Sequence, residues 1–116
     1  MSRKRQDPGT VLPLTPVAFE ILLTLADGDS HGYHIMQEVE RRTSGAITLH
    51  PGTLYRALAR LVDVGLIEEL DERPDPATDE RRRYYRLTLF GRDVARAEAA
   101  RLESQVRAAH AVLRVK

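Results

Sequence analysis

The chain has 116 residues, 42% hydrophobic and 30% charged, with a formal net charge of +1 and neither Cys nor Trp. This composition indicates one globular domain in water, and the lack of Cys excludes disulfides, thiolate catalysis and Cys-bound metals. With so little net charge, any surface that binds nucleic acid must be local. The longest apolar run, ILLTLA, is too short to span a bilayer, and MSRKRQDPGT precedes no signal-peptide core, so a cytoplasmic protein is expected.

The first half of the chain predicts three helices after an opening arm. Residues 1–13 are basic and broken by Pro and Gly, which favours a flexible arm. Thr15 is expected to cap a first helix that the sequence DGDS ends, and Ser30 to cap a second over HGYHIMQEVERR. A β-favouring piece, AITL, then leads to a third helix from Pro51 to Val64, closed by Gly65.

The second half predicts a hairpin and a long helix. LIEEL and RRYYRLTL favour strands, and the polar DERPDPATDE between them is typical of a mobile hairpin tip. On the second strand we expect Tyr85 to point inward and Tyr84 outward, because strand side chains alternate. Thr88 is expected to cap the final helix. The predicted fold is therefore mainly α with a small β-hairpin (α+β), a winged helix-turn-helix followed by a long C-terminal helix.

The final helix carries apolar residues at alternating spacings of four and three, the pattern of a coiled-coil seam. A helix of this length would extend roughly 35 to 40 Å, more than one small domain can cover. We therefore expect the seam to form a homodimer, the alternative being that it folds back on its own three-helix core. The seam residues are Ala95, Ala99, Leu102, Val106, Ala109 and Leu113.

The third helix has a face suited to reading DNA. At about 100° per residue, Thr53, Arg56 and Arg60 lie opposite the apolar stripe. An Arg side chain can bind guanine bidentately in the major groove, and the N-terminus at Pro51 and Gly52 offers backbone N–H groups to a phosphate. The alternative is that both arginines are ordinary solvated residues.

The hairpin adds a second basic group. Its arginines lie near the tip or along the second strand, where they could grip the sugar-phosphate backbone: Arg81, Arg82, Arg83 and Arg86. The acidic residues Asp75, Asp79 and Glu80 count against a simple phosphate clamp, because they offset the nearby arginines.

In the segments LTPVAFEILLTLADGDSHGYHIMQEVE, PGTLYRALARLVDVGLIEE and RRRYYRLTLFGRD the chain resembles the PadR-like transcriptional regulators. LYRALARLVDVGLI alone would also suit MarR-like regulators, but HGY, GTLY and YYRLT..G together favour PadR. The resemblance covers residues 14 to about 93 and is to the short-chain subgroup with one C-terminal helix. It implies a homodimeric repressor on a palindromic operator, with residues 51–64 as recognition helix, residues 71–83 as wing, and motif tyrosines at Tyr55 near DNA and Tyr85 in the wing.

The resemblance also implies an effector. Some members bind phenolic acids or flat hydrophobic drugs in the dimer cavity, where a Trp of the terminal helix helps to sandwich the compound. This chain has no Trp. For a small hydrophobic or aromatic effector, the candidate residues that would line a pocket are Phe19, Phe90 and Leu102. The alternative for each is that it only packs in the core or in the seam.

The expected organisation is a basic arm over residues 1–13, a winged-helix DNA-binding domain over 14–88 and a dimerisation helix over 89–116. No P-loop, GxGxxG or nucleophile elbow is present, so neither an enzyme nor a cofactor is predicted. His31, His34 and Glu38 share one helix, but a structural zinc needs four ligands, and no metal site is predicted. The alternative function is a winged-helix adaptor that binds an acidic protein partner.

Overall fold

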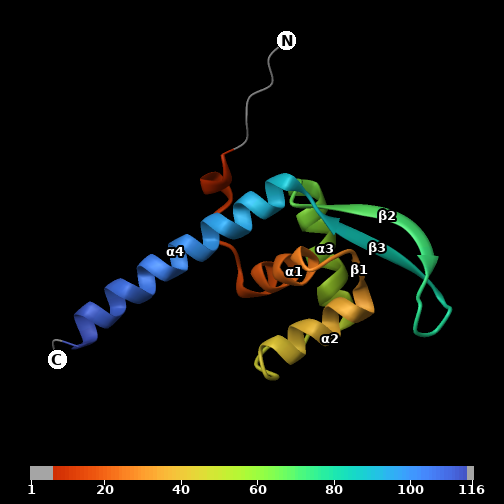
Figure 1. The fold of residues 1–116 in the computed structure, drawn as a ribbon, viewed down its shortest axis with the longest axis horizontal. Helices are drawn as coiled ribbons and strands as arrows, with labels where there is room; N and C mark the ends of the chain where they lie inside the picture. The colour runs from red at the N-terminus through yellow and green to blue at the C-terminus, as the bar shows by residue number, and fades with distance from the viewer. Residues whose placement is uncertain (1–6, 115–116) are drawn as a thin grey trace, which may run out of the picture.

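The computed structural model describes residues 7–114 of the chain (Figure 1). Its α-helices are α1 (Pro16–Ala26), α2 (Gly32–Arg42), α3 (Pro51–Val64) and α4 (Leu89–Arg114), and a short 3-10 helix, η1 (Pro8–Val11), precedes them. The strands β1 (Ser30–His31), β2 (Ile67–Pro74) and β3 (Arg81–Leu87) form one antiparallel sheet in the order β1-β3-β2. The predicted fold, a winged helix-turn-helix followed by a long helix, is confirmed.

The core lies where the apolar stripes of the first three helices meet. Apolar residues at helical spacing are buried on each of these helices, which fixes the face that each helix turns outward. Each fully buried aliphatic side chain contributes about 1.5 to 3 kcal/mol to folding. The buried stripe residues are Ile21, Leu22, Leu25, Ile35, Val39, Leu54, Leu58 and Leu61.

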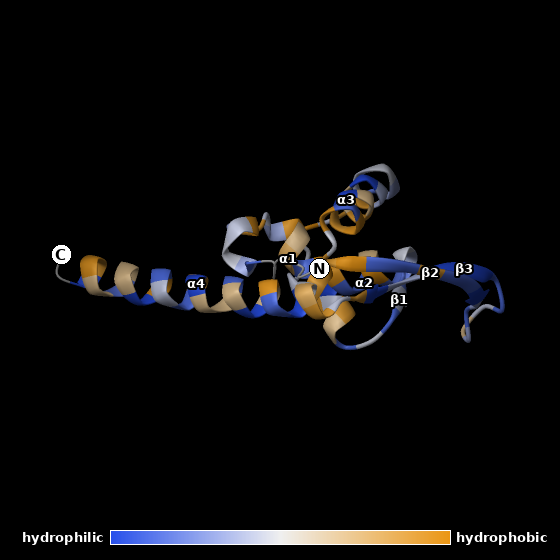
Figure 2. Ribbon diagram, turned by 90° about the horizontal axis from the view of Figure 1, so that it is seen from above, coloured by the Kyte–Doolittle hydropathy of each residue, from blue (hydrophilic) through white to orange (hydrophobic). Residues whose placement is uncertain are grey.

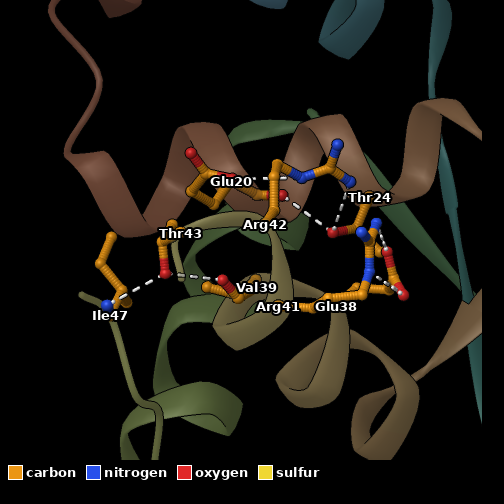
Figure 3. A network of polar contacts seen from close by, with 8 residues as sticks. All are labelled: Glu20, Thr24, Glu38, Val39, Arg41, Arg42, Thr43 and Ile47. Carbon is orange, nitrogen blue, oxygen red and sulfur yellow. Dashed lines mark hydrogen bonds and ion pairs between the residues drawn. The ribbon is translucent and has the colours of Figure 1, made fainter. Parts of the chain in front are cut away.

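Polar contacts join α1 to α2 at the start of the helix-turn-helix (Figure 3). The guanidinium Nε of Arg42 lies 3.3 Å from Glu20 Oε1, and its Nη2 donates to Thr24 Oγ1 at 3.5 Å. At the end of α2, Thr43 Oγ1 donates to the Val39 carbonyl and accepts from the Ile47 amide. These contacts set the angle between the two helices and direct the chain toward α3.

The predicted helix ends are confirmed at three positions. Thr15 accepts a hydrogen bond from the Ala18 amide, Thr88 accepts one from the Gly91 amide, and Gly65 ends α3 with a left-handed φ of 89°. The prediction for α2 was wrong: its N-cap is His31, whose ring Nδ1 accepts from the His34 amide at 3.2 Å. Ser30 instead belongs to β1, because it pairs there with β3.

The remaining predictions of local structure are mixed. The AITL segment forms no strand, because no neighbouring strand pairs with it. Tyr85 packs into the core as expected, and Tyr84 lies outside that core, but Tyr84 is only 8% exposed because other side chains cover it. The rings of His31 and Tyr84 pack edge to face with their centroids 5.3 Å apart, and the guanidinium carbon of Arg73 lies 4.1 Å from the centroid of the Tyr84 ring. These two side chains cover the outer face of the sheet at Tyr84.

The first half of α4 belongs to the core and the second half extends away from it (Figures 1 and 2). Val94, Ala95 and Glu98 are buried, whereas every residue from 103 to 114 is exposed. Helix η1 packs on α4, and the Leu14 amide donates to Glu98 Oε2 at 3.2 Å. Part of the expected flexible arm is thus a docked segment, and its basic run at residues 3–5 lies outside the described residues.

Candidate nucleic-acid interface

Helix α3 presents a polar face directly opposite its buried stripe. Thr53, Arg56 and Arg60 are all exposed on that face, as the helical spacing predicted. Within residues 7–114, neither Arg56 nor Arg60 forms an ion pair. Both guanidinium groups therefore keep their hydrogen-bond donors available for a ligand.

The N-terminus of α3 is also accessible. Its N-cap residue, His50, makes no side-chain capping hydrogen bond, and Pro51, Gly52 and Thr53 in the first turn are exposed. The first amides of a helix have no partner within the helix, so those of Gly52 and Thr53 point toward solvent with the positive end of the helix dipole. An anion can bind at such an end.

Tyr55 connects α3 to α2. Its side chain is 49% exposed, and its hydroxyl lies against the first residue of α2. A Cβ atom on Gly32 would lie only 2.5 Å from that hydroxyl oxygen, so a larger residue there would displace the Tyr55 side chain. The Gly of the HGY motif and the Tyr of the GTLY motif thus meet in the structure.

The wing arginines lie on the hairpin as predicted, but each already has a partner. Arg86 binds Asp29 with two hydrogen bonds of 3.1 and 2.9 Å, and Arg83 Nη1 lies 2.9 Å from Glu69 Oε2. Arg81 donates to the Glu72 carbonyl. The Arg86 guanidinium lowers the pKa of Asp29 below its usual value, which keeps this pair ionised.

The hairpin as a whole is acidic. Residues 67–87 contain seven carboxylates and five arginines, a formal charge of −2. Its outer part is strongly hydrophilic in Figure 2. The predicted acidic offset of the wing therefore appears as direct ion pairs, whereas Arg56 and Arg60 on α3 have no carboxylate partner in the described part of the chain.

Two buried polar residues in the wing region were not predicted as a pair. The imidazole Nε2 of His31 lies 3.1 Å from Asp75 Oδ2, and each side chain is only 9% exposed. The sequence alone could not join them, because one precedes α2 and the other lies beyond β2. No group of three His, Cys, Asp or Glu residues within 7–114 is placed to hold a metal ion.

The predicted seam on α4 is divided between core and solvent. Ala95 is buried in its own chain and Leu102 is half-buried, whereas Ala99, Val106, Ala109 and Leu113 are exposed. Phe19 and Leu102 line one shallow hollow with Ala99 and Val106. Phe90 is not part of this hollow and packs against the core instead.

No helix among the described residues has the length and apolar character needed to span a membrane.

Comparisons with known proteins converge on one family. The model of the transcriptional regulator PadR-like family matches residues 21–97. A transcriptional regulator from Clostridium thermocellum is 30% identical, with a TM-score of 0.68 over 81% of this chain and 89% of that one. A PadR family regulator from Clostridium difficile is 25% identical, with a TM-score of 0.72 over 85% and 99% of the two chains.

Two further comparisons are more limited. The structure of Bacillus subtilis PadR with operator DNA is 22% identical and has a TM-score of 0.60 over 72% of this chain and 47% of that one, which shows the fold alone. A 37.1 kDa protein in a transposon of Streptomyces fradiae is 42% identical over 89 residues, 74% of this chain. The chain spans about a quarter of that relative, 24% of its length.

Proposed function

Because the chain belongs to the PadR-like family of transcriptional regulators, we propose that it binds a specific DNA operator through α3 and acts as a repressor. The observation that carries this proposal is the exposed pair Arg56 and Arg60, one helical turn apart and without ion pairs among the described residues. Such a helix fits the major groove, where each guanidinium can reach a guanine. The operator complex of Bacillus subtilis PadR supports DNA as the partner.

In this proposal the operator is palindromic and the protein is a homodimer. The exposed second half of α4 supports the dimer, because Val106 and Leu113 are 51% and 68% exposed on the same stripe. A second copy would bury both residues in a symmetric contact. The two α3 helices, related by the two-fold axis, would then enter successive major grooves about 34 Å apart.

The same proposal gives the wing a secondary role in binding. Its arginines must exchange carboxylate partners for phosphates, so we expect it to contribute less affinity than α3. The hollow at Phe19 and Leu102 is the proposed place for a small hydrophobic or aromatic effector, since it lies on the face that a second copy would close.

The first experiment is selection of bound duplexes from a random pool, followed by titration of the selected duplex at several salt concentrations. A two-fold symmetric motif with half-sites about one helical turn apart is expected, with log K falling about 0.9 for each phosphate contact per unit of log salt. Shallow salt dependence without sequence preference would contradict the proposal.

That negative result would favour the alternative function, an adaptor whose basic patches bind an acidic protein. The acidic hairpin does not separate the two functions, because it repels a phosphate and an acidic protein alike. In the adaptor, the arginines of α3 would bind the acidic partner. The two functions differ in their target, since the adaptor would show no enriched duplex.

A further inference from the structure

A buried polar contact joins the wing tip to the start of α2. His31 directly precedes α2, and Asp75 lies just beyond β2 in the loop that leads to β3. Both residues are 7% exposed, and Nε2 of His31 is 3.1 Å from Oδ2 of Asp75. The polar atoms of such buried residues are costly to leave unpaired, so the contact holds the two segments together.

The hydrogen bonds of His31 fix its tautomer. Nδ1 accepts from the His34 amide and so carries no proton in this arrangement. The ring proton is therefore on Nε2, which donates to the carboxylate of Asp75. The other oxygen of Asp75, Oδ1, accepts from the Ala77 amide at 3.0 Å. Both ring nitrogens of His31 and both carboxylate oxygens of Asp75 thus have a defined partner.

Hydrogen bonds and an ion pair connect Asp75 to the other residues of the wing tip. The Asp75 amide donates to the Glu80 carbonyl at 2.8 Å, and the Asp79 amide donates to the Asp75 carbonyl at 2.7 Å. Arg82 Nε lies 3.4 Å from Asp75 Oδ2. The position of Asp75 therefore determines the position of the whole loop between β2 and β3.

The same contact lies next to the recognition helix. Gly32, the residue after His31, is the one that packs against the hydroxyl of Tyr55 on α3. A path of direct contacts thus runs from the wing tip through Asp75, His31 and Gly32 to Tyr55. It connects the two parts of the molecule that the proposed function places on DNA.

We propose that His31 and Asp75 form a latch that positions the wing tip relative to α3, and so sets which phosphates beside the half-site the wing can reach. This role rests on the proposed function. Neither residue needs to touch DNA: both are positioning residues that act through the loop they hold. Without the latch, the tip would move about β2 and β3 and lose its fixed distance from α3.

Two variants break the latch from its two sides. In Asp75→Asn the side chain can offer an oxygen to His31 or to the Ala77 amide, but not to both. In His31→Asn the shorter side chain no longer reaches Asp75, yet asparagine is a good N-cap and can still accept from the His34 amide. Glu80→Gln is the matched control, because it removes one charge from the same loop and leaves the His31 contact intact.

The latch itself is tested by amide hydrogen exchange in the free protein. Exchange of residues 75–80 is expected to rise about tenfold in Asp75→Asn and in His31→Asn, the effect of losing one charge-assisted hydrogen bond. Glu80→Gln should stay within twofold of wild type. Equal exchange in Asp75→Asn and Glu80→Gln would overturn the latch, and this comparison needs no DNA.

The effect of the latch on DNA affinity is tested with two duplexes. One holds the selected half-sites alone, and the other holds the same sites with flanks of five base pairs. Wild type should bind the flanked duplex more tightly, and both latch variants should lose most of that gain while keeping wild-type affinity for the short duplex. An unchanged gain in the latch variants would overturn the positioning role. If wild type binds no duplex, the proposed function fails, and the exchange experiment alone decides whether the latch exists.

Discussion

Arg56 and Arg60 differ from the wing arginines in what surrounds them. Neither has a carboxylate partner among residues 7–114, whereas Arg83 and Arg86 each lie within 3 Å of one. A phosphate or base can bind the first pair without breaking an existing ion pair. At the scale of single residues, base readout is therefore expected to depend on α3.

Replacing Arg56 by Ala should cost about 1 to 3 kcal/mol on the selected operator and relax the preference at one base pair, because a bidentate contact to guanine is lost. Fluorescence anisotropy on operator and random duplexes measures both effects. Arg41→Ala on α2 is the control, since Arg41 is exposed and its one ion pair among residues 7–114 is with Glu38 in its own helix. An equal loss on random DNA would argue against base readout by Arg56.

Two glycines at helix starts should respond oppositely to alanine. A Cβ on Gly91 would overlap the Leu66 carbonyl, so Gly91→Ala must push α4 away from the hairpin and destabilise the fold by about 1 to 3 kcal/mol. Gly52 has no neighbour within 4 Å of such a Cβ, so Gly52→Ala should stabilise α3 by about 0.5 to 1 kcal/mol. Urea unfolding of both variants checks this, and a stable Gly91→Ala would show that α4 does not cross Leu66 so closely.

The hydrogen bonds of Glu98 should make the free energy of unfolding fall as the solution becomes acidic. It is 2% exposed and accepts from Arg101 and from the Leu14 amide, and these hydrogen bonds, above all that of Arg101, lower its pKa in the folded state. Its contribution is thus fully present above the ordinary value of 4.5 and is lost as pH falls through the lowered pKa. Glu98→Gln should be less stable than wild type at pH 7, and the difference should shrink as pH falls below 4.5. A difference independent of pH, measured by urea unfolding, would contradict this account.

At the scale of elements, the helices could be predicted because each buries a stripe with helical period, visible in the sequence itself. The two-residue strand β1 could not, because Ser30 and His31 are extended only by pairing with Tyr85 and Tyr84, more than fifty residues later. The ion pairs of the wing were also hidden. They depend on the register shift of β2 against β3 between Glu69 and Glu72, which decides which carboxylates meet Arg83.

The acidic residues of β2 should restrain the wing. In the double variant Glu69→Gln with Glu72→Gln, Arg83 loses both carboxylates and becomes available to a phosphate. We expect tighter binding at low salt and a slope of log K against log salt steeper by about 0.9 for one added contact. The control Glu40→Gln with Asp93→Asn removes two exposed charges outside the wing. If it gives the same gain, overall charge and not the release of Arg83 is responsible.

For the whole molecule, α4 is the element that we expect to join two copies. Its 26 residues extend about 39 Å at 1.5 Å per residue, and the core covers only the first half. The apolar residues of the second half recur on one stripe that is exposed in the single copy that residues 7–114 describe. A two-fold dimer would use this stripe and would also set the distance between the two α3 helices.

Val106→Asp with Leu113→Asp should therefore halve the sedimenting mass at micromolar concentration, because each change places a charge in the proposed contact. Both side chains are more than half exposed in one copy, so the fold itself should be unaffected. Ser104→Asp is the matched control, since Ser104 lies about 180° around the helix from the stripe. The double variant should also lose binding to the full palindrome much more than to a single half-site. A double variant that sediments like wild type would mean that α4 does not join two copies.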